Sequence, residues 1–402
     1  MTSPRIQTRG ARLRAQSLHR ELLAAAQDGV VRFDRFMDLS LHHPTCGYYR
    51  AGASPLGPRG DFITAPALTA LFGQCLTLQV IQVWELLHRP GRFHLVEVGP
   101  GNGQLAGDIV ATAKKFPDFF SALHLTLVER SAALQRRQRQ RLARCGLPGS
   151  QVAWVAQVGE VGAGGPITGI ILSNEFLDVF PVRWLEWDGS QWCDLGARWT
   201  DAGWEVCRMG AATTLPAEMR PQLDFVPVPG YRCEVAEGLP AWIAEAAGCL
   251  QRGVLLSIDY GYPAHELRSS SRPMGTLVGH LAHERQDDPL CHPGGMDLTA
   301  HVDFTAVARA GELSGLETLG FTSQAWFLMS LGMLQRLETL RTQLPAEAWQ
   351  RHNDAVKRLL LPDGMGERFK VLAQGRGLDG AALYGFHGRD QRHRLFRHPG
   401  QC

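Results

Sequence analysis

Short apolar runs that end in polar residues recur along the chain, and runs of this length predict strands buried on both faces of a parallel sheet. Four such runs are 93–98 with Glu97, 123–128 before Glu129, 170–173 before Asn174, and 253–258 before Asp259. Segments with helical apolar spacing lie between them, which predicts an α/β fold with a doubly wound, mostly parallel sheet. The carboxyl ends of parallel strands share one edge, where we expect the four polar side chains to converge.

Other patterns predict additions to this sheet. Helical periodicity covers residues 11–27, 68–87, 131–145, 239–251, 304–314, 328–344 and 347–361. Tryptophans and glycines over residues 184–208 predict a β-meander inserted in the sheet, and residues 263–295 are expected to be polar and flexible. The predicted division is an N-terminal helical segment, residues 1–90, and a core, residues 91–402, with insertions at about 184–235 and 263–300 and a helical region at about 328–372.

Composition excludes several classes of partner. The chain has 402 residues, of which 45% are hydrophobic, enough for a large core with insertions. Its formal net charge of +2 gives no global reason to bind nucleic acid. The arginine-rich helix at 131–145 is interpreted as a solvated face, because Leu134 and Leu142 give it an inward side. No apolar run has the length of a membrane span, and no secretory signal is recognised.

Cysteine and histidine usage indicates no metal site. Nine cysteines are dispersed without a Cys-x-x-Cys pair, as is typical of reduced thiols in a reducing compartment. His42, His43 and Cys46 lie together, but no second ligand pair accompanies them. The first twenty residues contain arginines and no acid, as a mitochondrial transit peptide does. We favour a basic start that leads into a helix, because apolar periodicity begins by Leu13.

A glycine loop follows the strand at 93–98, with glycine at alternate positions, namely Gly99, Gly101 and Gly103. Glycine lets the backbone turn tightly and approach a ligand closely. A dinucleotide loop, Gly-x-Gly-x-x-Gly, would have glycine where Gln104 stands. In addition, Pro100 removes a backbone N–H that a pyrophosphate would use. The loop therefore favours S-adenosyl-L-methionine, which has no phosphate, over a dinucleotide.

Two acids complete this predicted cofactor site. Glu97 lies near the end of its strand, at a position where its carboxylate can help hold the cationic methionine end of the cofactor. Glu129 stands after the second strand, like the acid that accepts hydrogen bonds from ribose hydroxyls in nucleotide folds. Asn102 and Asn174 are the other side chains expected to contact the cofactor.

The loop Asn174-Glu175-Phe176-Leu177-Asp178 is expected to face the transferable methyl group. It is not Asn-Pro-Pro-Tyr, so amino-methylation of a DNA base is not indicated. Glu175 and Asp178 can converge on one cation, and carboxylates grip the planar fork of a guanidinium. We predict that both orient the acceptor and take up its proton. The alternative is a helix N-terminus whose dipole stabilises two acids.

The glycine loop and the loop at residues 174–178 resemble the corresponding segments of the MidA-like family. This family includes the mitochondrial complex I assembly methyltransferase that dimethylates an arginine. The glycine loop occurs in many methyltransferases, whereas Gly60-Asp61-Phe62-Ile63-Thr64 and Asp297-Leu298-Thr299-Ala300-His301-Val302-Asp303-Phe304 are far more particular. Residues 257–261 and 365–370 also match. The likeness runs in family order from about residue 22 to residue 386.

The resemblance implies a class I methyltransferase core with the N-terminal segment folded over the cofactor. It implies that Asp61 and Thr64 lie near the cofactor and that His283, His301 and Asp303 line the far side of the site. The expected substrate-side residues are Asp259, Tyr260, His283 and His301. The alternatives are a capped turn at Asp61 and Thr64 and, for His283, His301 and Asp303, structural polar residues of a helix start. The chain departs from the family at Ala67, where glutamate is usual, and at His280, where an aromatic is usual.

The expected function is transfer of a methyl group from S-adenosyl-L-methionine to a protein arginine, of the complex I assembly type by resemblance. Two alternatives stay open: a non-catalytic assembly factor that retains the cofactor fold, and a small-molecule methyltransferase. A protein substrate is the expected partner, and the oligomeric state is not predicted. The expected compartment is the cytoplasm in a bacterium and the mitochondrial matrix in a eukaryote.

Overall fold

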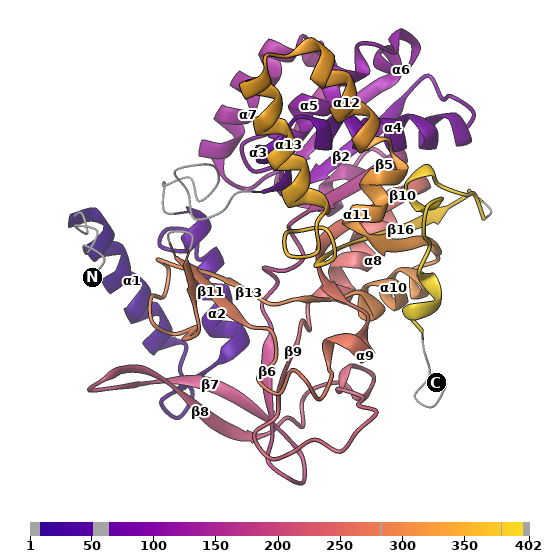
Figure 1. Ribbon diagram of the computed structural model, residues 1–402. Helices are drawn as coiled ribbons and strands as arrows, with labels where there is room; N and C mark the ends of the chain where they lie inside the picture. The colour runs from indigo at the N-terminus through magenta and orange to yellow at the C-terminus, as the bar shows by residue number, and fades with distance from the viewer. Residues whose placement is uncertain (1–8, 51–63, 282–283, 379, 397–402) are drawn as a thin grey trace.

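A twisted sheet forms the centre of the computed structural model, which describes residues 9–50, 64–281, 284–378 and 380–396 (Figure 1). Its strands follow the order β15-β16-β10-β5-β2-β3-β4. Their bounds are β2 (Phe93–Val98), β3 (Leu123–Val128), β4 (Val152–Val155), β5 (Ile167–Asn174), β10 (Leu250–Tyr262), β15 (Glu317–Ser323) and β16 (Phe369–Arg376), and β14 (Val302–Asp303) pairs with the end of β10. Strands β10, β5, β2, β3 and β4 pair in parallel. Strand β16 is antiparallel to both of its neighbours, β10 and β15, so β15 runs in the same direction as β10. The predicted doubly wound, mostly parallel sheet is confirmed.

Alternate side chains of the buried strands enter two cores on opposite faces of this sheet. Leu95 and Ile170 pack with helices of one face, and Val96 and Ile171 with helices of the other. The first face holds α3 (Ala65–Leu68), α4 (Leu71–Leu86), α5 (Gln104–Ala113), α6 (Pro117–Ala122), α7 (Ala132–Cys145), α11 (Gln324–Ser330), α12 (Met333–Gln343) and α13 (Ala346–Leu360). The second face holds α8 (Leu239–Cys249) and α10 (Phe304–Leu313).

Two predicted helices are each divided in two. The expected helix at 68–87 begins earlier as α3, and the extended backbone of Thr69 (φ −162°) separates α3 from α4. The expected helix at 328–344 is divided between α11 and α12, because Gly332 takes the left-handed conformation at φ 80°. Apolar periodicity continues across both breaks, so the pattern alone could not find them.

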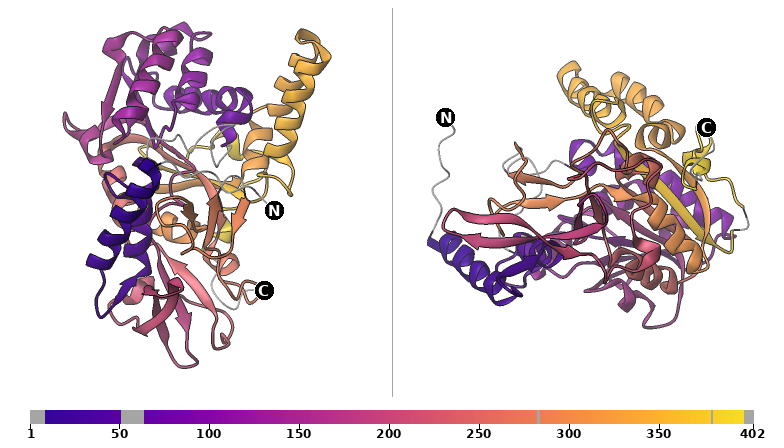
Figure 2. Two further views of the ribbon diagram at one scale, coloured as in Figure 1. Left: turned by 90° about the vertical axis from the view of Figure 1, so that its left-hand side faces the viewer. Right: turned by 90° about the horizontal axis from the view of Figure 1, so that it is seen from below.

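The predicted β-meander forms from β6 (Arg183–Trp187), β7 (Trp192–Thr200) and β8 (Gly203–Ala211). The prediction that it is inserted in the central sheet is wrong. It builds a separate sheet with β9 (Arg232–Val235) and the N-terminal β1 (Val30–Arg32). Trp184 and Leu195 on this sheet pack against α1 (Arg9–Ala24) and α2 (Phe33–His42). The N-terminal helices thus give the meander an apolar partner of its own, away from the central sheet (Figure 2).

The stretch predicted to be flexible, residues 263–295, contains regular structure in its described part. It forms α9 (Ala264–Leu267), β11 (Val278–Leu281) and β12 (Glu284–Gln286), and β11 also pairs with β13 (Asp297–Thr299). The Glu234 carboxylate holds the start of this small sheet by accepting from the backbone N of Thr276 (2.9 Å) and Leu277 (3.1 Å). Among the helices built from described residues, none is both long and apolar enough to cross a lipid bilayer.

Candidate functional site

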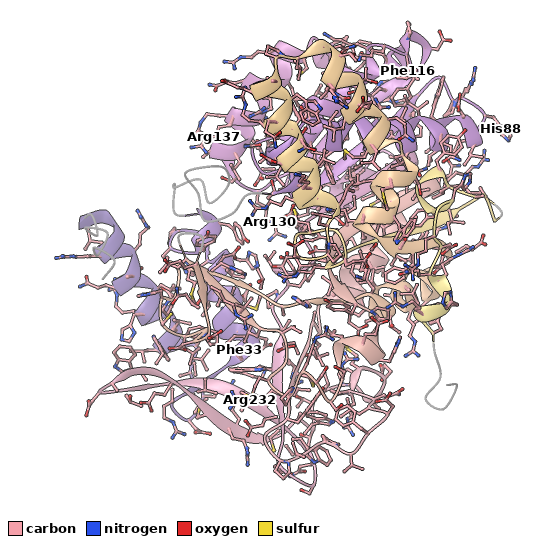
Figure 3. The ribbon with its side chains drawn as sticks, in the orientation of Figure 1. Phe33, His88, Phe116, Arg130, Arg137 and Arg232 are labelled. Carbon is pink, nitrogen blue, oxygen red and sulfur yellow. The ribbon has the colours of Figure 1, made fainter. Side chains whose placement is uncertain are left out.

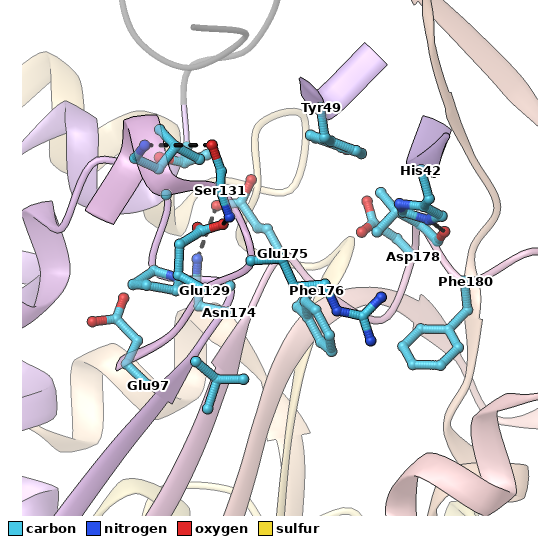
Figure 4. A pocket seen from close by; sticks show the side chains of 18 of the residues that line it. His42, Tyr49, Glu97, Glu129, Ser131, Asn174, Glu175, Phe176, Asp178 and Phe180 are labelled. Atoms are coloured by element: carbon cyan, nitrogen blue, oxygen red, sulfur yellow. Dashed lines mark hydrogen bonds between the residues drawn. The ribbon is translucent and has the colours of Figure 1, made fainter. Parts of the chain in front are cut away.

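A cavity of about 480 Å³ lies at the carboxyl edge of the central sheet. The ends of β2, β3 and β5 line one side of it, and α2 and α3 contribute residues from the N-terminal segment. Figure 4 shows Glu97 and Glu129 at one end, Glu175 in the middle, and Asp178 with His42 at the other end. The convergence predicted for the strand ends therefore holds for Glu97, Glu129 and Asn174, which all line the cavity.

The glycine loop between β2 and α5 requires glycine for its backbone conformation. Gly99, Gly101 and Gly103 have φ values of 64°, 51° and 75°, in the left-handed region that other residues avoid. A Cβ on Gly99 would also lie 2.8 Å from the ring of Phe176. Gly99, Gly101 and Asn102 line the cavity, whereas Gly103 immediately precedes α5 and is not among the lining residues.

Gln138 on α7 holds this loop in place, a role that our sequence analysis missed. Its side-chain amide donates to the Gly101 carbonyl (2.8 Å) and the Glu129 carboxylate (3.4 Å), and its oxygen accepts from the Trp154 indole (2.9 Å). Gln138 is fully buried. It stands four residues from both Leu134 and Leu142, so helical spacing places it on the inward face and could have identified it.

The arginine-rich helix is only in part the solvated face that we predicted. Arg137 lies at the outer surface (Figure 3). Arg141 instead turns toward the glycine loop, where its guanidinium donates to the Asn102 carbonyl (3.2 Å) and the Gln104 side chain. The loop is therefore held from α7 by one buried amide and one guanidinium.

The two predicted cofactor acids differ in environment. Glu97 is 4% exposed, and burial raises the pKa of its carboxyl from 4.5 to about 8. Its Oε2 has no hydrogen-bond partner among the described residues. Glu129 is anchored differently, because its Oε1 accepts from the Ser131 backbone N at 2.6 Å. A cationic ligand group beside Glu97 would compensate the burial of its charge.

Glu175 joins the central sheet to the N-terminal segment. Its Oε1 accepts from the backbone N of Ala65 (2.9 Å), at the start of α3, and from the Asn174 amide (3.2 Å). Its backbone takes φ 52°, uncommon for a residue with a side chain. Burial raises the pKa of Glu175 to about 7. Residues 175–182 form no helix, so the alternative of a helix beginning at these acids is wrong.

Asp178 lies at the far end of the cavity and is 5% exposed. Burial raises the pKa of its carboxyl to about 6, while the Tyr260 hydroxyl donates to it and stabilises the ionised form. Tyr260 also lines the cavity, as expected for a substrate-side residue. Both acids of this loop thus have raised pKa values near neutrality, and the aspartate has a tyrosine partner.

The expected substrate-side position of Asp259 is wrong. Asp259 is fully buried and is not among the residues that line the cavity. Its Oδ2 accepts from the backbone N of Phe176 (3.0 Å) and Leu177 (2.8 Å), so it fixes the loop that carries Glu175 and Asp178. Burial, and then the charge of Asp178, raises the pKa of Asp259 well above its usual value. The carboxylate of an acid at a strand end can face the ligand or the next loop, and the sequence does not distinguish these two orientations.

Aromatic and acidic side chains from distant segments also line the cavity at the end that holds Asp178, and the sequence did not indicate them. The Tyr49 hydroxyl donates to both oxygens of Asp297 at 2.9 Å. The His42 ring stacks on Tyr49 with centroids 5.8 Å apart, and its Nε2 lies 3.2 Å from the Val179 carbonyl oxygen. His42, Tyr49 and Asp297 all line the cavity. His43, the neighbour of His42, contacts Cys46 through Nδ1 in a turn.

The remaining predicted residues are distributed over several places. Thr64 lines the cavity but makes no side-chain cap to α3. His301 does not line this cavity, and Asp303 caps α10 by accepting from Ala306 N (3.0 Å), the structural alternative for that residue. Asp61 and His283 lie outside the described residues. Of the two departures from the family pattern, Ala67 lines the cavity, whereas His280 lies on β11 and does not.

Comparison with known proteins gives these features a context. A family model described as "Putative S-adenosyl-L-methionine-dependent methyltransferase" matches residues 75–322. The mitochondrial "Protein arginine methyltransferase NDUFAF7 homolog" of Drosophila melanogaster is 28% identical over 401 residues, which covers 92% of this chain and 86% of that protein. Human mitochondrial "Protein arginine methyltransferase NDUFAF7" is 28% identical over 377 residues, or 86% of this chain and 80% of its own length.

A solved structure provides a closer match. It is a "likely methyl transferase" from Burkholderia thailandensis bound to S-adenosyl-homocysteine, with a TM-score of 0.85 and 32% identity over 98% of this chain and 99% of that chain. S-adenosyl-homocysteine is what remains of S-adenosyl-L-methionine after the methyl group has left. The class I methyltransferase fold and the cofactor predicted from the sequence are confirmed.

Proposed function

The chain belongs to the MidA-like family of S-adenosyl-L-methionine-dependent methyltransferases, and from that premise we propose that it methylates an arginine of a protein. The charge of the cavity supports this most directly. Its acidic lining residues are Asp38, Glu97, Glu129, Glu175, Asp178, Glu245 and Asp297. Among the described lining residues, Arg130 is the only lysine or arginine. An acidic cavity of this kind attracts a cationic cofactor and a cationic acceptor together.

The residues at the glycine-loop end fit the cofactor. Glu97 offers a buried carboxylate oxygen without a partner among the described residues to the cationic methionine end, and the loop glycines let the backbone approach closely. The proposed cofactor contacts are Glu97, Gly99, Gly101, Asn102, Gly103, Glu129, Asn174, Asp61 and Thr64. When bound, the cofactor supplies a methyl group already activated by its sulfonium.

Cofactor binding is expected to release a proton from Glu97. With a pKa of about 8, most of this carboxyl is protonated at pH 7 before binding, and a cation beside it favours the ionised form. Titration calorimetry at pH 7 in buffers of different ionisation enthalpy should detect close to one released proton. Affinity should rise with pH up to about 8 because less work is then needed to remove that proton.

Glu97→Gln is the matched variant for this experiment, since it keeps the shape and removes the titration. It should bind S-adenosyl-homocysteine about 10- to 100-fold more weakly, as expected when one charge partner is lost, and release no proton. Proton release equal to that of the wild type would show that another group is responsible.

Glu175, in the middle of the cavity, and Asp178, at its far end (Figure 4), are proposed to hold and deprotonate the acceptor. A protonated guanidinium is a poor nucleophile because its lone pair is delocalised. Two carboxylates can orient its planar fork and accept the proton that leaves as the methyl group transfers. Their raised pKa values, about 7 and about 6, make them better proton acceptors than free carboxylates. Tyr260 holds Asp178 in place for this role.

Mass spectrometry of methylated peptides tests the proposal in the source cells. Deleting the gene should remove methylarginine from a small set of proteins, and the wild-type gene, but not Glu175→Gln, should restore it. By resemblance, respiratory complex I and its assembly proteins are the first to examine. Methylarginine that stays unchanged while a small-molecule methyl product disappears would favour a small-molecule enzyme. No methyl product at all, with cofactor binding retained, would favour a non-catalytic assembly factor.

The proposed compartment follows the source of the chain. The curated relatives are named as mitochondrial proteins, and the solved structure is bacterial. We propose the mitochondrial matrix for a eukaryotic source and the cytoplasm for a bacterial one.

A further inference from the structure

A second cavity of about 540 Å³ adjoins the first, and Asp178 lines both. It lies between α9, α10, the segment that follows β9, and the 3-10 turn at residues 217–219. The proposed proton-accepting carboxylate therefore stands on the wall between the two cavities. Nothing in the methyl-transfer chemistry described above uses the second one.

The second cavity has an apolar interior and a charged rim. Its buried apolar wall includes Val182, Val235, Leu239 and Ala310. Exposed charges of both signs line it as well, namely Glu218, Arg220, Asp224 and Arg309. Leu313 is also a lining residue, yet its side chain is 90% exposed. An apolar pocket with a mixed polar rim is typical of a site that anchors one side chain of a polypeptide.

Two side-chain nitrogen atoms of this wall have no hydrogen-bond partner among the described residues. They are His301 Nδ1 and Arg268 Nε, and both atoms are buried. Burial and the charges of nearby cationic side chains lower the pKa of His301 to about 4, so its ring is neutral. Arg268 is already charge-paired with Asp303 at 2.7 Å. A neutral ring nitrogen and a single guanidinium N–H suit the amide groups of a peptide better than an ion.

The His301 ring connects this wall to the first cavity. It lies between Tyr260 and Tyr262, with centroids 5.2 and 5.7 Å away. Tyr260 lines the first cavity and donates its hydroxyl to Asp178. A group that contacts His301 from the second cavity is therefore one side chain away from the tyrosine that positions the carboxylate.

We propose that the second cavity binds the acceptor protein beside its methylated residue. An apolar side chain of the acceptor fills the interior, and the peptide group next to it bonds to Arg268 and His301. The acceptor sequence then needs a large apolar residue at one fixed spacing from the arginine. This assignment rests on the proposed function for the identity of the methylated residue, but the peptide-binding step does not require methyl transfer.

The test uses the full-length protein with S-adenosyl-homocysteine and an array of short peptides. Each peptide has one central arginine and a single leucine or phenylalanine at a varied position among glycine and serine. A parallel array replaces the arginine by norleucine. Ala306→Trp fills the cavity from α10 at a partly exposed position, and Leu313→Glu places a charge at its exposed rim. The matched controls are Ala111→Trp on α5 and Leu334→Glu on α12, which are exposed and line neither cavity.

Binding of wild-type protein should depend on the position of the apolar residue. Both cavity variants should weaken that binding at least about tenfold, while cofactor affinity and the two controls stay at wild-type values. Peptides that bind in this way but accept no methyl group would overturn arginine as the acceptor and leave the cavity assignment intact. Absence of position-dependent binding, or equal binding by Ala306→Trp and Leu313→Glu, would overturn the assignment itself.

Discussion

Gly101→Val is expected to abolish cofactor binding. Valine would have to adopt φ 51°, a conformation that a β-branched residue avoids. Its side chain would also stand on a loop residue that lines the cavity, where the backbone must approach the ligand. Strain and lost contact together should raise the Kd for S-adenosyl-homocysteine by more than about 100-fold, or about 3 kcal/mol. Titration calorimetry measures this directly.

Gly149→Val is the control for this variant. Gly149 begins a 3-10 turn and lacks a positive φ, and a Cβ added there would meet no atom within 4 Å. It should bind the cofactor as the wild type does. Far-ultraviolet circular dichroism and thermal unfolding should show that Gly101→Val still folds. Unchanged affinity in a folded Gly101→Val protein would remove the glycine loop from the proposed site.

Glu175→Gln is expected to lower kcat by at least about 100-fold, the usual contribution of a positioned acid–base group. Glutamine keeps an oxygen that can accept from Ala65 N, so the Kd for the cofactor should change by less than about threefold. In the wild type, kcat/KM should rise as pH increases through about 6 to 7, because both carboxyls must ionise to bind a cation. The variant should lose the component that titrates near 7.

Comparison with Glu175→Ala separates two roles of this side chain. Alanine removes the charge and also the hydrogen bond that holds the start of α3. Glu175→Ala should therefore lose cofactor affinity in addition to turnover, whereas Glu175→Gln should lose turnover alone. If both variants lost affinity and turnover equally, Glu175 would act through the cofactor or the fold and not on the acceptor.

The residues proposed for the cofactor end could be grouped from the sequence because most of them are local. Glu97 and the glycines lie within one strand–loop–helix unit, and the unit's geometry follows from chain direction and from residues that tolerate positive φ. Glu129 and Asn174 could be added because parallel strands end at one edge. None of these inferences required knowledge of how distant segments pack.

The acceptor end could not be predicted in the same way, because it is assembled from distant parts of the chain. Tyr49 donates a hydrogen bond to Asp297, which lies 248 positions later in the chain, and no sequence pattern around either residue predicts this pairing. Asp259 shows the same limit from the other side: strand periodicity located its backbone, but only the packed loop reveals that its carboxylate faces Phe176 N and Leu177 N. For the meander, the strands were predicted correctly but the sheet was not, because the meander pairs with the N-terminal strand β1 and not with the central sheet.

The position of the antiparallel strand β16 affects how the protein folds during its synthesis on the ribosome. It pairs with β10 along residues 253–260 and separates β10 from β15, although both of those strands precede it in the chain. During synthesis, the apolar edge of β10 therefore stays open until residue 376 has emerged. An unpaired strand edge can recruit a strand from another chain. Nascent chains stalled before β16 should need a chaperone to remain monomeric, whereas chains that include β16 should not.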